Sequence, residues 1–329
     1  MALDEVRALI DQLAKASERQ DRAALQRLIR AYGTLYRRLE PRVKLIAERA
    51  ARDAMTPAQV RRMEELRNLE RATAAELDDF SRTLTAEITT GTRSAATLGA
   101  AHAAAMLAAA VAGTPADGAR IRRPTPDALD AMLEWTRPGS KLRDKIDALA
   151  PFHSQRVADA LVEAIAAGRN PQAVAGVVQD YFGGGLTDAL RMTRTSQLYA
   201  YRQATRLGYE ENGVEGWTWF AQLDERTCLS CVSMHGTTHP PDEILNDHHN
   251  GRCAMVPIVA GQNFVEQDGA AWFDGLDESQ QQAMMGRDRF ELYQSGNLDW
   301  GALSTTREDD VYGPMRVEAP AWQVLGAEP

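Results

Sequence analysis

Cysteine and histidine residues gather in one short stretch of the sequence. All three cysteines, Cys228, Cys231 and Cys253, lie there with four of the six histidines. The order is Cys228-x2-Cys231, sixteen further residues, and then His248-x4-Cys253. Zinc takes thiolate and imidazole donors at the corners of a tetrahedron, and a Cys-x2-Cys turn supplies two donors from one knuckle. The spacing therefore predicts a zinc site formed by Cys228, Cys231, His248 and Cys253.

Spacing alone does not decide which histidine is the fourth ligand. His249 adjoins His248 and is an equally placed donor, and His235 and His239 stand nearby in the sequence. Two metal-free alternatives also remain: three reduced, buried thiols, or a redox-active Cys-x2-Cys pair. A redox pair usually follows a strand and opens a helix within a strand–helix–strand unit, and no such pattern surrounds Cys228.

The predicted metal is expected to be structural. A catalytic zinc keeps an open coordination position near a general base, and Asp242, Glu243 and Asp247 are in range along the chain. Three thiolates, however, make the metal a poor Lewis acid. A closed, structural site is therefore favoured over a catalytic one.

Acidic residues are concentrated in the last third of the chain. The 37 Lys and Arg and 46 Asp and Glu give a net charge of −9. Residues 215–329 hold 6 basic and 19 acidic residues, whereas residues 1–112 hold 18 basic and 15 acidic. Proteins that grip phosphate backbones use clustered Lys and Arg, so DNA contact is expected only in the N-terminal half.

Two long amphipathic helices are predicted in the N-terminal third, because apolar residues recur there at three- and four-residue steps. The first covers 3–40, with a break near Ser17 and an interruption at Pro41. Thr56 and Pro57 open the second as N-cap and first-turn residues. An intramolecular bundle is favoured over a coiled-coil seam between chains.

Neither secretion nor a membrane is expected. Three cysteines are too few for a disulfide-stapled secreted scaffold, and the acidic start MALDEVRALI is unlike a signal peptide. The run 95–112 approaches the length of a membrane span, but it is mostly Ala, which contributes little to insertion. This run is expected to form a closely packed, buried helix.

The middle of the chain is predicted to be helical and the last third to be mixed. After a Gly- and Pro-rich linker come helices at 126–137, 140–168 and 171–182, the last ending at three consecutive glycines, and then a helix from Thr187 to Glu211. Aromatic and β-branched residues predict strands at 217–221 and 254–259, short helices follow at 277–285 and 287–293, and 305–329 is expected to be an extended tail.

Four stretches of the chain match the motifs of a known family. They are AIAAGRNPQAVAGVV, the helix MTRTSQLYAYRQATRLGY, the strand and knuckle GWTWFAQLDERTCLSCVSMHGTTH, and the ending HHNGRCAMVPIV. With them the segment from about 157 to 259 resembles the phage head-morphogenesis family, the minor head proteins named after the F protein of phage Mu. Two positions depart from the family pattern: Ser196 replaces an acidic residue, and Gly251 replaces a cysteine.

The resemblance implies a structural role without catalysis. It implies a minor head (capsid) protein of a tailed phage or prophage that acts in head morphogenesis near the portal, in DNA packaging or in ejection. The family's metal-type residues fall on the four residues already singled out by spacing. Arg194 matches the family's helix arginine, and we expect it to form a structural ion pair with Asp224.

Partners and location follow from the same resemblance. The expected partners are the portal or the major capsid protein, with self-association of the chain. The expected location is the virion, in the capsid interior or at the portal vertex, with the host cytoplasm during assembly. Two rival functions stay open: a zinc-dependent hydrolase or nuclease, and a zinc-knuckle nucleic-acid-binding protein.

Together these patterns predict a mainly α (α+β) protein: a long-helix N-terminal bundle, a small zinc-clamped β module and short C-terminal helices. The predicted segments are the long-helix bundle at 1–112, the linker at 113–126, the helical part of the head-morphogenesis domain at 127–215, the zinc-binding β module at 216–260, and short helices with an extended tail at 261–329.

Overall fold

The computed structural model describes residues 2–112, 118 and 120–327. It is 66% helical with two small antiparallel sheets, which confirms the mainly α class and the long N-terminal helices. The chain forms two compact units. Unit 1 comprises Met1–Glu18, Thr92–Leu133 and Gln197–Pro329, and unit 2 comprises Arg19–Gly91 and Glu134–Ser196. Both units are discontinuous because each long helix contributes residues to both, whereas the predicted segments were consecutive.

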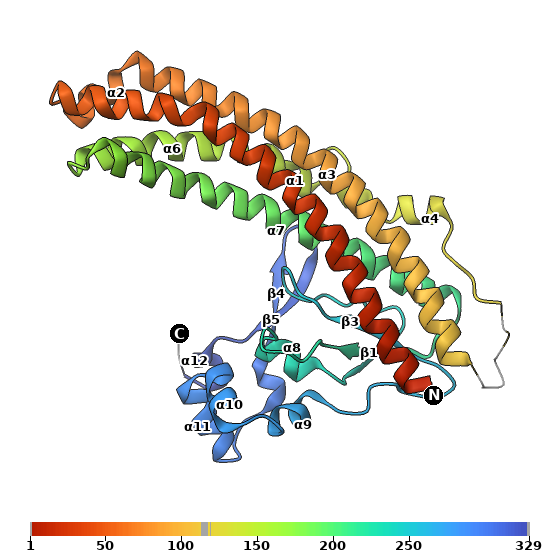
Figure 1. The fold of residues 1–329 in the computed structure, drawn as a ribbon. Helices are drawn as coiled ribbons and strands as arrows, with labels where there is room; N and C mark the ends of the chain where they lie inside the picture. Colours follow the sequence, from red (N-terminus) through yellow and green to blue (C-terminus); the bar gives the residue numbers. More distant parts are fainter. Residues whose placement is uncertain (1, 113–117, 119, 328–329) are drawn as a thin grey trace. The chain divides into compact units, whose positions relative to one another are not determined.

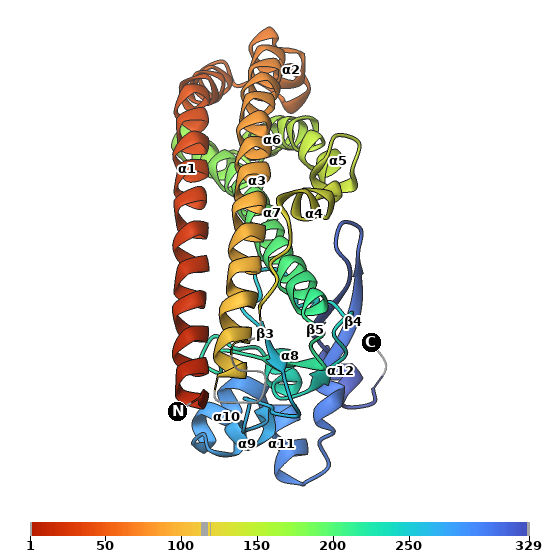
Figure 2. The same cartoon turned by 90° about the vertical axis from the view of Figure 1, so that its right-hand side faces the viewer.

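Two long helices pair side by side over the parts of them that belong to unit 2. They are α1 (Ala2–Arg52) and α3 (Glu64–Val111), connected through the short α2 (Pro57–Arg62) (Figures 1 and 2). Ion pairs of Arg27 with Glu87 and of Arg38 with Glu76 show that the two helices run antiparallel, because numbers rise along one as they fall along the other. The predicted N-cap is confirmed, because Thr56 and Gln59 form a capping box. The helix that it opens ends at Arg62, however, and the second long helix begins at Glu64 rather than at Pro57.

The predicted interruptions of α1 are wrong. The helix continues through Ser17 and contains Pro41. A proline inside a helix removes one backbone hydrogen bond, which is costly. Here the apolar face continues beyond it, with Val43 and Ile46 each only 1% exposed. Burial of this face outweighs the local effect of the proline.

The helices in the middle of the chain are divided differently from the prediction. Each of the helices predicted at 126–137 and 140–168 is two shorter elements, whereas those predicted at 171–182 and Thr187–Glu211 form one long helix. The elements are α4 (Pro126–Ala131), the 3-10 turn η1 (Glu134–Thr136), α5 (Lys141–Asp147), α6 (Leu149–Ala166) and α7 (Pro171–Glu211). Within the predicted linker, residues 113–117 and 119 lie outside the described residues, and 120–125 have no regular structure.

The three glycines do not end a helix, which corrects the prediction, because α7 passes through them. At Gly185 a Cβ atom would lie 2.6 Å from the Tyr32 hydroxyl and 3.3 Å from ring atoms of His153. Here glycine permits a close approach between buried side chains and helix backbone, which is a packing role rather than a helix stop.

Unit 1 contains a three-stranded antiparallel sheet in the order β2-β1-β3. The central strand β1 (Gly216–Phe220) pairs with β2 (Thr238–His239) and with β3 (Ala254–Ile258), and the latter places Trp217 opposite Pro257. Trp217 and Trp219 project to one face, as alternate strand residues do. Both are essentially buried, in a cluster that also holds the thiols of Cys231 and Cys253. The two predicted strands are confirmed.

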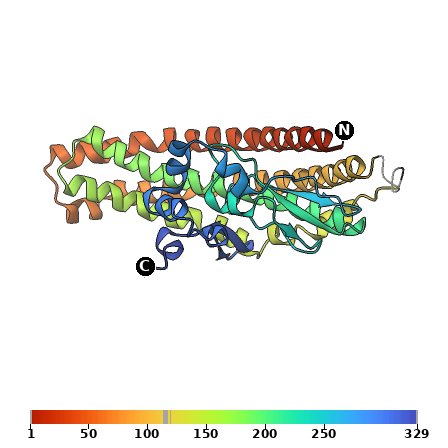
Figure 3. The same ribbon diagram turned by 90° about the horizontal axis from the view of Figure 1, so that it is seen from below.

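The C-terminal segment is folded rather than extended, and this differs from the predicted tail. After α8 (Leu229–Met234) come α9 (Gly269–Asp274), α10 (Glu278–Met285), α11 (Arg287–Gln294), the turn η2 (Trp300–Leu303), the hairpin β4 (Ser304–Asp309) with β5 (Gly313–Glu318), and α12 (Ala321–Val324) (Figures 1 and 3). Leu229 and Val232 of α8 pack in one cluster with Phe273 and Phe290. The C-terminal helices thus complete the core beside the Cys-x2-Cys knuckle.

One helix among the described residues is long and apolar enough to cross a membrane, judged by length and composition. It is α3, and 61% of its most apolar window is buried. A core helix of a soluble protein passes the same test. At Gly99 a Cβ would lie 2.2 Å from the Tyr201 carbonyl oxygen, so this part of α3 packs directly against the backbone of α7.

Candidate metal centre

Cys228 and Cys231 are held by the first turn of α8. Cys228 is the N-cap residue, and its sulfur accepts a hydrogen bond from the backbone N–H of Cys231 at 3.4 Å. The preceding turn is fixed by Asp224, whose carboxylate accepts from Arg226 N at 3.0 Å and from Thr227 Oγ1 at 3.1 Å. This turn leads from the buried strand β1 into the knuckle.

His248 faces both of these thiols. Its Nε2 lies 3.3 Å from the sulfur of Cys228 and 3.3 Å from that of Cys231. Its Nδ1 lies 2.9 Å from the carbonyl oxygen of His249, and because a carbonyl only accepts, Nδ1 carries the proton. In the neutral ring the lone pair therefore lies on Nε2, where a metal can bind it. Donors around tetrahedral zinc stand about 3.5–3.8 Å apart, close to the distances found here.

The other histidines of the cluster have different partners. His249 Nε2 lies 3.3 Å from Asp309 Oδ2. His235 Nδ1 accepts from Ala221 N at 2.9 Å, and the ring of His239 stacks on Trp217 with centroids 4.3 Å apart. Between the two adjacent histidines, the geometry favours His248 as the ligand.

The fourth predicted ligand, Cys253, belongs to a second group of donors. Cys228, Cys231 and His248 form one set with donor atoms within 4.8 Å of one another, and Cys231, Asp247 and Cys253 form another. Cys231 is common to both sets. These five residues could form a metal site, and Asp247 is the member that spacing singled out only as a candidate base.

A carboxylate–arginine clamp joins the two halves of the site. Arg252 donates two hydrogen bonds to Asp224, from Nη1 at 2.7 Å and from Nη2 at 2.6 Å. The clamp links the turn before Cys228 to the residue before Cys253. Arg252 is part of the Gly-Arg-Cys ending of the sequence motif, but no pattern in the sequence indicated that it pairs with Asp224.

The predicted ion pair of Arg194 with Asp224 is corrected by these contacts. Asp224 binds Arg252, and Arg194 Nε lies 3.8 Å from Asp21 Oδ2 in unit 2. Asp21 is only 5% exposed, so this is a buried carboxylate facing a partly buried arginine. Arg194 therefore forms a structural ion pair, but with Asp21 of α1, which passes beside this part of α7.

The metal-free donors influence one another's protonation. The hydrogen bonds with Cys231 and His248 lower the pKa of the Cys228 thiol to about 5 although burial opposes this. The neighbouring thiols and burial raise the pKa of Cys231. Although burial favours neutral His248, its contacts with Cys228 and Asp247 raise its pKa to about 9. Burial raises the pKa of the Cys253 thiol. A divalent cation here would displace the remaining thiol protons and the Nε2 proton of His248.

The hollow beside these donors is small. Its volume is about 60 Å³, and its lining includes Cys228, Cys231, His248 and Cys253. Organic ligands usually occupy cavities of about 300–1,000 Å³. The space therefore suits an ion and not an organic substrate.

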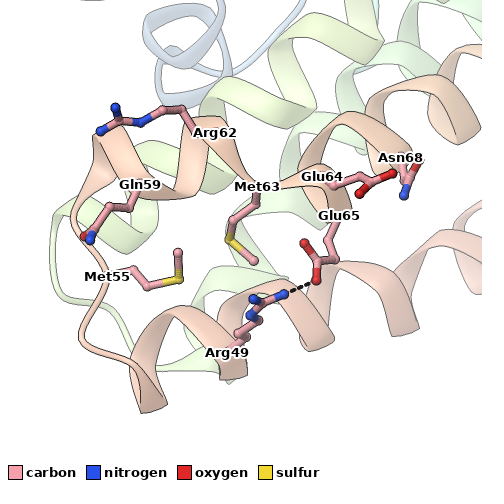
Figure 4. Close-up of a pocket in the computed structure, with 8 residues that line it drawn as sticks. All are labelled: Arg49, Met55, Gln59, Arg62, Met63, Glu64, Glu65 and Asn68. Carbon is pink, nitrogen blue, oxygen red and sulfur yellow. Dashed lines mark hydrogen bonds and ion pairs between the residues drawn. The ribbon is translucent and has the colours of Figure 1, made fainter.

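A larger hollow of about 590 Å³ lies in unit 2, at the turn between α1 and α3 (Figure 4). Its lining mixes charged side chains with Met55 and Met63. Arg49 and Glu65 form an ion pair across it (Figure 4). It contains none of the residues predicted to act in a site.

Comparison with known proteins gives one match, and it covers the metal centre. Neither the curated proteins nor the solved structures contain a match to the chain. Residues 155–256, which run from α6 into β3 and include every candidate ligand, match the family model described as phage Mu protein F like protein. This match confirms the resemblance found in the sequence motifs: the segment 155–256 is similar to phage Mu F-like proteins.

Proposed function

We propose that this chain is a structural minor head protein of a tailed phage or prophage, acting in head morphogenesis near the portal. The observation that carries the proposal is the match of residues 155–256 to the phage Mu F-like model. That segment contains α7, the sheet around β1 and all the candidate metal ligands. The match suggests a phage head protein, and the specific role near the portal, in packaging or in ejection, is our extension of it.

The metal of this protein is proposed to be a structural zinc. Cys228, Cys231, His248 and Cys253 supply the soft donors that zinc prefers. The hollow of about 60 Å³ and the buried surroundings suit a closed site rather than one that admits a substrate. When bound, zinc would supply a cross-link between α8 and the loop that precedes β3. These features favour the structural reading over a hydrolase or nuclease.

The proposed partners are the portal or the major capsid protein, together with further copies of this chain. The acidic last third favours a protein partner there, because 19 acidic against 6 basic residues in 215–329 repel a phosphate backbone. DNA contact, where it occurs, is assigned to the N-terminal half. The proposed location is the virion interior or portal vertex, after assembly in the host cytoplasm.

The test of the head-protein proposal is the composition of particles. Purified virions of the encoding phage, or of the induced prophage, should contain the chain in a few copies per portal, measured by quantitative mass spectrometry. Particles made without it should show a defect in assembly, packaging or ejection. Finding the chain only in the soluble lysate, with particles unaffected by its deletion, would contradict the proposal.

A separate experiment tests the zinc. Protein purified without added metal should contain about one zinc per chain by elemental analysis, and Cys228→Ser should lose it. A Ser230→Ala variant is a matched control, because Ser230 lies between the two knuckle cysteines and is not a ligand. Absence of stoichiometric zinc in the unmodified chain would refute this part.

A further inference from the structure

A buried ion pair lies directly behind the metal ligands. Arg202 of α7 and Asp247 have side chains that are 5% and 1% exposed, and Arg202 Nη2 lies 3.2 Å from Asp247 Oδ2. Burying two charges is costly unless other hydrogen bonds satisfy them. The partners of these two side chains therefore indicate what the pair does.

Among the described residues, the partners of the Asp247 carboxylate are candidate ligands and Arg202. Oδ1 accepts from the backbone N–H of His248 at 2.8 Å and from the Cys231 thiol at 3.4 Å. Oδ2 accepts from the backbone N–H of Cys253 at 3.3 Å and from Arg202. Zinc would displace the Cys231 proton, but the bonds from the two backbone N–H groups and from Arg202 do not depend on it. Both oxygens therefore stay engaged, and the carboxylate is suited to hold ligands in place.

Arg202 fixes the opposite side of the same loop. Its Nη2 donates to the carbonyl oxygen of Gly251 at 2.9 Å and to that of Cys253 at 3.0 Å. The loop 247–253 is thus held to α7 through both its carbonyl and its N–H groups. A zinc ion bound by three thiolates carries a net negative charge, and the buried guanidinium places a positive charge beside it.

Gly251 provides the space for this arrangement. A Cβ atom at this position would lie 1.9 Å from Asp247 Oδ2. The family motif has a cysteine at this position, so the departure found in the sequence coincides with the space that the carboxylate occupies.

We propose that Arg202 and Asp247 are positioning residues of the metal site, which hold the loop 247–253 so that His248 and Cys253 face the Cys228–Cys231 knuckle. The inference rests on the zinc proposed above and adds two residues that are not ligands. They act through the ligands, because residues that hydrogen-bond to metal ligands fix the orientation of those ligands. Replacing such residues typically lowers metal affinity by about 10- to 100-fold.

The experiment measures metal release and ligand identity in the full-length chain. Asp247→Asn and Arg202→Lys should each accelerate zinc transfer to a chromogenic chelator by about 10- to 100-fold. With cobalt(II) in place of zinc, the thiolate charge-transfer bands should keep the energy and intensity of the unmodified chain, because no ligand has been removed. Gly251→Ala should also accelerate release, since it displaces the carboxylate without changing a charge.

Matched controls are available nearby. Arg206→Lys changes an arginine one turn further along α7 that pairs with Glu210, and Asp242→Asn changes an exposed carboxylate of the same loop region. Both should release zinc at the rate of the unmodified chain.

The outcomes separate this inference from the zinc proposal. If the unmodified chain binds no zinc, both fail. If it binds zinc and the three variants release it at the unmodified rate, only the positioning role fails. A cobalt spectrum of Asp247→Asn with altered bands would make Asp247 a ligand and would also overturn the role. If one of the three variants fails to fold, the other two still test the role, because each alters a different contact of the loop 247–253.

Discussion

At the scale of single residues, spacing in the sequence predicted the cysteine ligands and one histidine ligand. It did not predict the buried residues that surround them. Cys228, Cys231 and His248 come together as the spacing predicted they could. The buried pair of Arg202 and Asp247 joins residues 45 positions apart, and no local pattern marks an arginine in a long helix as buried. Partner choice of this kind depends on the tertiary fold, which also explains why Asp224 pairs with Arg252.

The Asp224–Arg252 clamp gives a first prediction. Arg252→Lys keeps the charge and loses one of two parallel hydrogen bonds, so we expect a loss of about 1–2 kcal/mol in the free energy of unfolding. Arg93→Lys is the control, because its pair with Asp130 is 63% and 53% exposed and should matter by less than about 0.5 kcal/mol. Urea titration at pH 7 measures both, and equal effects of the two variants would contradict the assigned role.

The same clamp predicts a pH dependence. Arg252 holds the pKa of the Asp224 carboxyl well below its usual range. A carboxyl with a lowered pKa in the folded state stabilises the fold at all pH values above its unfolded pKa, about 3.9. That stability should fall as the pH drops below about 4. Asp224→Asn should show a smaller loss of stability over this acidic range in the same titration, and parallel curves would argue against it.

A second pH effect is predicted at His102 of α3. Burial lowers the pKa of His102 to about 4, and its Nδ1 lies 2.9 Å from the Tyr201 hydroxyl. Because the unfolded chain binds a proton near pH 6.5 and the folded chain does not, stability should decrease by about 2 kcal/mol between pH 7 and pH 4.5. His102→Gln should remove most of this decrease in pH-dependent urea unfolding. A variant as acid-sensitive as the unmodified chain would show that His102 is not the cause.

At the scale of elements, local rules located helices and strands well but misjudged where they end. The cap of α2 and the strands β1 and β3 follow from turn chemistry and residue type. Pro41 and the triple glycine are helix breakers by local propensity, yet both lie inside helices whose faces are buried. The hairpin of β4 and β5 was missed because its strands are mostly half-exposed and lack clear alternation.

The glycines of α7 give a prediction with an internal control. Gly→Ala in a helix ordinarily stabilises by about 0.5–1 kcal/mol, and Gly184→Ala should do so because no heavy atom lies within 4 Å of its added Cβ. Gly185→Ala should instead destabilise by about 1–3 kcal/mol, since Tyr32 is held against Phe80 with ring centroids 4.8 Å apart. Thermal unfolding measures the two, and stabilisation by both would refute the close-packing role.

At the scale of the whole molecule, the two units have different kinds of core. The helical unit 2 packs aliphatic residues with Tyr32 and Phe182, whereas unit 1 buries Trp217 and Trp219 beside the thiols. What the sequence could not show is that three long helices pass through both units. This is because apolar residues recur at the same spacing along a helix in both units, so the sequence pattern does not mark where one unit ends and the other begins.

Metal removal should therefore affect the two units unequally. Cys231 and Cys253 share a cluster with Trp217 and Trp219, and five of the six tryptophans lie at or after position 217. Removing zinc with a strong chelator should shift tryptophan emission to longer wavelength and lower the melting temperature of unit 1. The helices of unit 2 contain none of the candidate ligands, so most of the helical circular dichroism at 222 nm should persist. Readdition of zinc should restore the emission, whereas magnesium, which prefers oxygen ligands, should not. Loss of the whole helical signal on chelation would show instead that the two units unfold as one.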